Sequence, residues 1–135
     1  MKKWFLALFM ALAAFWLAQP QASAAVISTD TMILDWTSNK VWIDGGDLCV
    51  RGTFTNKRDD LTITKLNDMD MTITFTRSDG TKYQYQGKPV KMPMLKLKAN
   101  GSKTVTLNFG PFEGDWKDWV TSENYIFTYI NGARW

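Results

Sequence analysis

The stretch Asp47-Leu48-Cys49-Val50-Arg51-Gly52-Thr53-Phe54-Thr55-Asn56 decides the fold of this 135-residue chain. Its apolar and polar side chains alternate, which predicts a strand with one buried face and one solvated face. Gly52 falls on the buried face, where a missing side chain admits a bulky neighbour or a second backbone. Because Gly45-Gly46 precedes the stretch, we expect it to be entered through a tight hairpin.

Turn residues divide the rest of the chain into further short strands. Ser78-Asp79-Gly80-Thr81 is the strongest hairpin signal, and Thr37-Ser38-Asn39-Lys40 predicts another turn. The alternation slips near Asn67-Asp68, which predicts a bulge or a break between strands. Pro89 and Pro93 flank residues 90–92, a segment that is either a sheet edge or a crossover between sheets, because proline cannot donate to a sheet ladder.

These features predict an all-β fold. Seven or eight short strands, with turns at intervals of about 8 to 12 residues, are typical of an immunoglobulin-like antiparallel β-sandwich of ~110 residues. One short helical turn is expected near residues 115–120, across an open end of the sheets. Asp115 would cap it, with Trp116, Trp119 and Val120 on one face.

The first 24 residues predict an N-terminal signal peptide. Lys2 and Lys3 precede an uncharged apolar run over residues 4–18, which is shorter than the ~20 residues that span a bilayer as a helix. Ala22 and Ala24 supply the small-x-small pattern that a signal peptidase cuts after. We therefore predict a secreted or extracytoplasmic protein with one domain over residues 25–135, and an uncleaved anchor is the alternative.

The composition excludes several classes of function. Without Lys2 and Lys3, the chain has 14 basic and 13 acidic residues, a net charge of +1. This charge gives no support for a nucleic-acid or anionic-membrane partner. The chain has no histidine, which excludes Ser-His-Asp and Cys-His catalysis and, with a single cysteine, a zinc site in practice. Cys49 cannot form an internal disulfide and is expected to be buried, and a reactive or intermolecular thiol is the alternative.

The carboxylates offer two weaker alternatives. Asp59-Asp60, Asp68/Asp70 and Asp115/Asp118 form local pairs at loops or polar faces, so a catalytic pair is possible but solvation and turn formation explain them more simply. Asp44 and Asp47, or Asp68 and Asp70, could hold calcium, although neither pair has the spacing of a calcium loop. We expect no enzyme activity and no cofactor.

Several segments resemble a known class of domains. The run from Leu48 to Asn56, the strand ending Phe75-Thr-Arg-Ser-Asp-Gly80, and Leu97-Lys-Ala-Asn-Gly101 before Val105-x-Leu107-x-Phe109 are similar to small exported bacterial immunoglobulin-like domains of the FxLYD and S-layer-associated kind. The resemblance covers about half the chain, roughly residues 47–109. It implies an accessory or adhesive module of the cell envelope, and it implies no functional residue.

The aromatic residues are the candidate ligand site. Exposed tryptophan and tyrosine rings could stack on the C–H faces of sugars, and the candidates are Trp116, Trp119, Tyr83 and Tyr85. The alternative is that these rings are core, because a small domain without disulfides needs large apolar side chains. A second possible mechanism is an open sheet edge near Pro89–Pro93 that accepts a partner strand.

We therefore expect a monomeric, non-catalytic binding module. Its partner would be an unknown protein or glycan of the cell envelope, and it would meet a membrane only during export. The alternatives are a carbohydrate-binding or cell-wall-binding module that uses the aromatic rings and a small carboxylate-based carbohydrate-active or inhibitory protein.

Overall fold

Residues 47–56 form the middle strand of a three-stranded antiparallel sheet in a computed structural model, which describes residues 24–132. The strands are β1 (Val26–Ser28), β2 (Leu34–Asp44), β3 (Asp47–Asn56), β4 (Leu61–Thr76), β5 (Lys82–Gly87), β6 (Ser102–Pro111) and β7 (Asp118–Asn131). Sheet A has the order β1-β7-β4-β5 and sheet B the order β2-β3-β6, with antiparallel pairing throughout.

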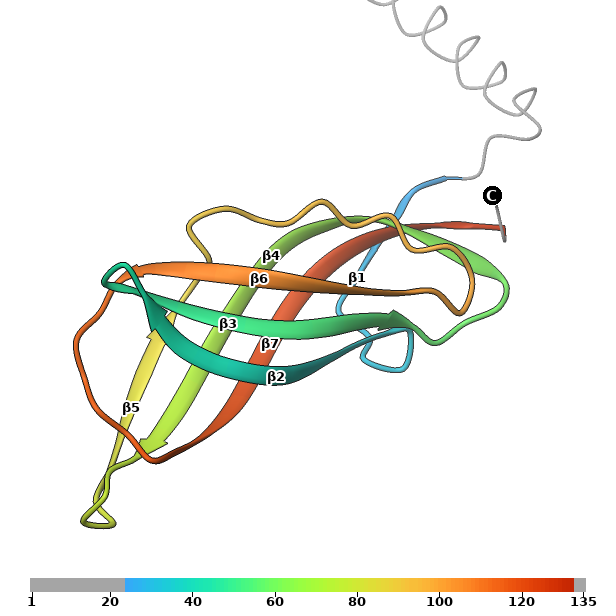
Figure 1. Ribbon diagram of the computed structural model, residues 1–135. Coiled ribbons are helices and arrows are strands. Elements are labelled where there is room, and N and C mark those ends of the chain that lie inside the picture. The colour runs from blue at the N-terminus through green and yellow to red at the C-terminus, as the bar shows by residue number, and fades with distance from the viewer. Residues whose placement is uncertain (1–23, 133–135) are drawn as a thin grey trace, which may run out of the picture.

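The two sheets form the two layers of an antiparallel β-sandwich of seven strands (Figure 1), as the sequence predicts. Alternating side chains of both sheets fill the space between them, because each strand turns every second residue inward. The largest fully buried side chains are Phe54, Phe75, Phe127, Leu34, Leu48, Leu61, Ile63, Met69, Met71, Ile73, Leu95 and Leu107.

Gly52 lies under a bulky neighbour, as predicted. A Cβ atom added there would be 2.2 Å from Cζ2 of Trp36 and 2.5 Å from the carbonyl oxygen of Thr37. The indole ring of Trp36 therefore occupies the space that any other residue would fill at position 52. Its own centroid is 4.7 Å from that of Phe54, so the missing side chain lets two large rings pack together.

The predicted hairpins are also present. Asp44 pairs with Asp47 across a two-residue turn in which Gly45 and Gly46 have φ angles of 61° and 88°. The second hairpin joins β4 to β5, and Gly80 has a φ of 91°. The slip expected near Asn67-Asp68 is a register shift in the β4–β7 ladder. Residues 88–101, which include both prolines, are a crossover from sheet A to sheet B.

Two predictions are wrong. Residues 37–40 are not a turn but part of β2, where Ser38 pairs with Gly52, Lys40 pairs with Arg51 and the extra residue between them forms a bulge. The helical turn at 115–120 is absent as well. Residues 118–120 begin β7 and pair with residues 74–76 of β4, because a ladder satisfies backbone groups that a single helical turn leaves open.

The described residues contain no helix that could cross a membrane. Ala22 of the predicted cleavage pattern lies outside these residues, and Ala24 is the first of them. The signal peptide therefore stays a prediction.

Candidate functional site

Aromatic rings close the end of the sandwich where the β4–β5 hairpin projects beyond sheet B (Figure 1). The ring of Phe75 lies at their centre, with centroids 5.1 Å from Tyr83, 5.5 Å from Phe112 and 4.5 Å from Trp116. Tyr85 meets Phe112 edge to face at 5.2 Å. We call these five residues the aromatic cluster. Their mutual contacts extend the hydrophobic core where the second sheet does not reach.

The local sequence explains this arrangement. Alternation along β5 turns Tyr83 and Tyr85 toward the inner side of sheet A and leaves Lys82, Gln84 and Gln86 exposed. The connection 112–117 passes close to them because Gly114 has no side chain. A Cβ atom at Gly114 would be 2.6 Å from the hydroxyl oxygen of Tyr83, which would have to move.

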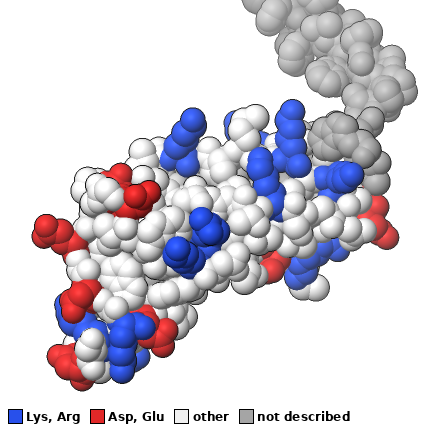
Figure 2. All heavy atoms as spheres, in the orientation of Figure 1, with Lys and Arg blue, Asp and Glu red and all other residues white. Residues whose placement is uncertain are grey.

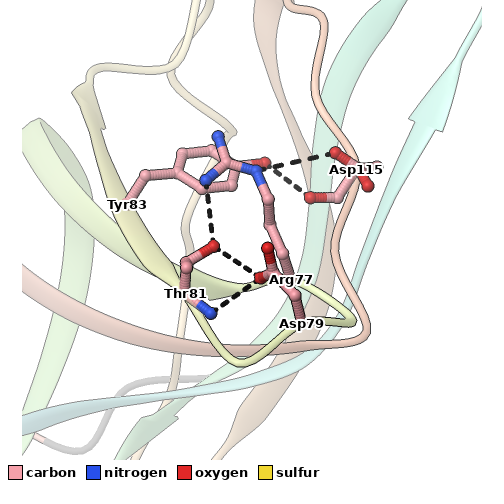
Figure 3. Close-up of polar contacts among 5 residues, drawn as sticks. All are labelled: Arg77, Asp79, Thr81, Tyr83 and Asp115. Atoms are coloured by element: carbon pink, nitrogen blue, oxygen red, sulfur yellow. Dashed lines mark hydrogen bonds and ion pairs between the residues drawn. The ribbon is translucent and has the colours of Figure 1, made fainter.

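Polar side chains cover the outer side of the cluster (Figure 3). The guanidinium of Arg77 lies over the ring of Tyr83, 4.2 Å from its centroid, and its Nε is 3.8 Å from Oδ1 of Asp115. The hydroxyl of Tyr83 donates to the carbonyl oxygen of Asp115 at 3.0 Å. Thr81 donates through its main-chain N–H and its hydroxyl to Asp79, and these bonds lower the pKa of that carboxyl. The Tyr83 ring therefore already has Phe75 and Arg77 as neighbours.

The structure brings three of the four aromatic candidates together. Tyr83, Tyr85 and Trp116 belong to the cluster, whereas Trp119 packs against the core from β7, where its backbone pairs with Phe75. Trp119 makes no ring–ring contact with another described aromatic residue. All four side chains are half-buried. Ligand binding by these residues stays a prediction, and their contacts give them a structural role as well.

We predict that Trp116→Ala destabilises the fold. The indole is half-buried and packs on Phe75, so its loss should lower the free energy of unfolding by about 1–2 kcal/mol, less than the 3–5 kcal/mol of a fully buried ring. Trp119→Ala, which removes no ring–ring contact, should have a smaller effect. Urea unfolding followed by far-ultraviolet dichroism measures both. A Trp116→Ala variant of unchanged stability that loses retention on wall polysaccharide would instead favour a ligand site.

A groove of about 790 Å³ separates the crossover from the edge strand β6. One wall is apolar and contains Val90, Met92, Pro93 and Met94, and β6 contributes Thr106 to the other. Val90 and Met94 are 72% and 70% exposed, so two large apolar side chains of this wall face solvent. We call this space the crossover groove. It lies at the segment that the two prolines single out in the sequence.

The wall formed by β6 carries open backbone groups. The N–H of Val90 donates to the carbonyl oxygen of Asn108 at 2.8 Å, so the main chain of Asn108 faces away from β3. Because this direction alternates along an antiparallel strand, Thr104 and Thr106 also point their N–H and C=O groups away from β3. Within the described residues, no hydrogen bond occupies these groups. The Nζ of Lys103 donates to the carbonyl oxygen of Met94 at 2.7 Å, which ties the crossover at a second point.

A smaller cleft of about 440 Å³ lies at the edge of β7 that β1 leaves uncovered. It includes Asp68 and Asp70, one of the predicted carboxylate pairs, and also Glu123, which sequence reasoning missed. Glu123 shares the inward side of β7 with Tyr125 and Phe127, and this shared parity is the signal that could have identified it.

Glu123 stands at the end of a chain of hydrogen bonds. Nε1 of Trp36 donates to Oγ of Ser38 at 2.7 Å, and that oxygen lies 2.7 Å from Oγ1 of Thr121. Burial raises the pKa of the Glu123 carboxyl, a hydrogen bond from Thr121 opposes the rise, and the nearby charge of Asp35 adds to it. Oε1 of Glu123 is buried and has no hydrogen-bond partner among the described residues.

We predict that Glu123→Gln stabilises the protein at neutral pH. A carboxyl whose pKa is higher in the folded state gives its full stability below the unfolded pKa and loses it as the pH rises through the folded pKa. Gln has no such loss, so the melting temperature of the variant should exceed that of the parent at pH 7.5 and match it near pH 3.5. Glu113→Gln, at an exposed position, is the control. A difference that does not change with pH would contradict this explanation.

Cys49 is buried, as predicted, with 4% of its surface exposed. It lies between Trp42 and Asn108 in the register of sheet B. Burial raises the pKa of its thiol, and the carboxylates of Asp44 and Asp47 raise it further, which disfavours the nucleophilic thiolate. Among residues 24–132, no three His, Cys, Asp or Glu side chains form a group that could hold a metal ion.

Comparison with known proteins adds no assignment. No protein-family model matches the chain, and no curated protein matches it. One solved structure, described as the X-ray structure of Northeast Structural Genomics Consortium target SoR45, is similar over 79% of this chain and 74% of its own. The two are 8% identical with a TM-score of 0.25, which is too low to support an argument about fold or function.

Proposed function

We propose that this chain is an exported, non-catalytic binding module of the cell envelope that holds an extended segment of a partner protein in the crossover groove. The observation that carries the proposal is the open backbone edge of β6 at Thr104 and Thr106, which faces a groove with an apolar opposite wall. Proteins commonly use such edges to add a strand from a partner.

Both walls of the groove support this mode of binding. An added strand would form main-chain hydrogen bonds with Thr104 and Thr106, and every second side chain could meet the exposed apolar groups of Val90 and Met94. The hydrogen bonds give affinity that does not depend on sequence, and the side-chain contacts give specificity. The predicted signal peptide supports a location outside the cytoplasm.

The aromatic alternative has less support. Binding of a sugar needs a free ring face, and the rings of Tyr83 and Trp116 both contact Phe75. The crossover groove, by contrast, combines open space, apolar side chains and unused backbone groups in one place.

The proposal predicts that Thr106→Pro strongly weakens binding without unfolding the protein. Proline removes the N–H that faces the groove and leaves the bonds to β3, so an edge strand tolerates it. The probe is a synthetic ten-residue peptide that alternates valine and glutamine, titrated into the isotope-labelled mature chain. Amide shifts should follow β6 and the crossover, and Thr106→Pro should weaken binding at least tenfold.

Thr106→Val is the matched control, because it keeps the N–H and changes only the side chain. It should bind the peptide like the parent. Equal binding by the proline variant, or shifts centred on another face of a correctly folded protein, would overturn the proposed function.

A further inference from the structure

Lysine side chains gather beside the crossover groove. Between Gly80 and Phe112 the chain contains six lysines and no aspartate or glutamate, although acidic residues are frequent before and after this segment. Figure 2 shows several basic side chains projecting from the upper edge of the molecule, along which the crossover runs in Figure 1. The near-neutral net charge therefore conceals a separation of charge over the surface.

Five of these six lysines form no ion pair with a described residue; Lys82 donates to Thr76 beside the β4–β5 hairpin, and the other four lie on the crossover or at the start of β6. Lys91, Lys96, Lys98 and Lys103 are exposed and form no ion pair with a described residue. Lys88, in contrast, is 2.8 Å from Oδ2 of Asp68. We call Lys91, Lys96, Lys98 and Lys103 the basic rim. Lys91 lines the crossover groove, and Lys103 ties its far end to Met94.

We propose that the segment bound in the crossover groove is acidic, an extended polypeptide with Asp or Glu side chains directed at the basic rim. This inference rests on the proposed function. The open N–H and C=O groups of Thr104 and Thr106 require complementary groups at the spacing of a strand, which a polypeptide backbone offers and a lipid surface or a polysaccharide does not. The unpaired lysines then select for carboxylates by charge complementarity.

The two ends of the crossover groove differ in charge. Asp47 lines the end near the β2–β3 hairpin, where its Oδ2 accepts a hydrogen bond from Nδ2 of Asn108 at 3.0 Å. A carboxylate beside Asp47 would be repelled. The acidic residues of the segment therefore lie toward Met94 and Lys103, and uncharged residues lie toward Asp47.

The basic rim should determine selectivity more than total affinity. An exposed ion pair contributes little by itself and is screened by salt, so four such contacts together favour an acidic over a neutral segment by about tenfold at low ionic strength. This preference should largely disappear in 0.5 M salt, whereas the contribution of the backbone hydrogen bonds should persist.

The test compares three synthetic ten-residue peptides that alternate valine with glutamate, glutamine or lysine, titrated into the mature chain at low salt. The glutamate peptide should bind about tenfold more tightly than the glutamine peptide, and the lysine peptide more weakly than both. Changing the four rim lysines to glutamine should reduce binding of the glutamate peptide to that of the glutamine peptide. The matched control changes Lys40, Lys57, Lys65 and Lys117 to glutamine and should keep the preference.

The outcomes separate this inference from the function on which it rests. If the glutamine and glutamate peptides bind equally and both are lost in Thr106→Pro, the groove takes a strand but the inference is wrong. If no peptide binds, both proposals fail. If heparin or vesicles of anionic lipid bind the parent and Thr106→Pro equally, and more tightly than the glutamate peptide, the basic rim serves a polyanion or a membrane and the inference is again overturned.

Discussion

Gly52→Ala should lower the free energy of unfolding by about 3 kcal/mol, a large part of the stability of a small domain. The added methyl group would lie 2.2 Å from Cζ2 of Trp36 and 2.5 Å from the carbonyl oxygen of Thr37. Trp36 is buried and held by its hydrogen bond to Ser38, so its ring cannot swing away freely. The backbone of β2 cannot retreat without breaking its ladder with β3.

Urea unfolding followed by tryptophan fluorescence measures this loss, and Gly87→Ala is the matched control. Gly87 also lies in a strand, but the closest atom to its added Cβ is the hydroxyl oxygen of Tyr85, at 2.3 Å. That oxygen is the outer atom of the half-buried Tyr85 side chain, which can move aside. We expect Gly87→Ala to cost about 1 kcal/mol. Equal losses in the two variants would show that the Trp36 contact is not the cause.

Asn56→Ala is the second substitution with a large expected effect. The Asn56 side chain is fully buried, and its Nδ2 lies 3.1–3.2 Å from the carbonyl oxygens of Leu61, Leu97 and Lys98. Its Oδ1 accepts the N–H of Arg58 at 3.0 Å. One amide thus joins the end of β3, the start of β4 and the crossover. Alanine removes all four hydrogen bonds and leaves space where the buried amide lay, which should cost about 3–4 kcal/mol, although the carbonyl oxygens of Leu97 and Lys98 keep their bonds from the N–H groups of Ile63 and Gly101.

Asn56→Asp tests the cause of that loss. Aspartate has almost the same shape but donates no hydrogen bond when ionised, and it places a charge beside three carbonyl oxygens. We expect a loss at pH 7 at least as large as that of alanine, and a smaller one at pH 4, because burial would raise the pKa of the new carboxyl. Asn39→Ala, at an exposed site, should change stability by less than about 0.5 kcal/mol.

The sequence patterns that predicted the fold correctly are those set by local chemistry. Alternation identified β3 and the inward place of Gly52, and glycines with positive φ marked both tight hairpins. The failures arose where pairing with a distant strand overrode local preference. Residues 37–40 have the composition of a turn, yet they pair with β3. Their turn preference leaves a trace only at the bulge between Ser38 and Lys40.

The candidate sites show the same division. The prolines at 89 and 93 identify the crossover, but only the strand order places Thr106 opposite them and opens the groove. The charge separation was hidden because the net charge averages over the chain, although six lysines without an acidic residue are readable in the sequence. Likewise, spacing alone could not show that Phe112, rather than Trp119, joins the aromatic cluster.

The position of β7 has a consequence for the order of folding. β7 lies between β1 and β4 and follows every other described strand in the chain, so most contacts of sheet A form only once residues 118–131 are available. Until then the first half of β4 pairs only at Ile63, with Leu97 of the crossover, so the folding of sheet A depends on contacts between residues that are far apart in the sequence. Such a late step in folding would suit export through a translocation channel, which the predicted signal peptide implies, because a chain must be unfolded to pass through it.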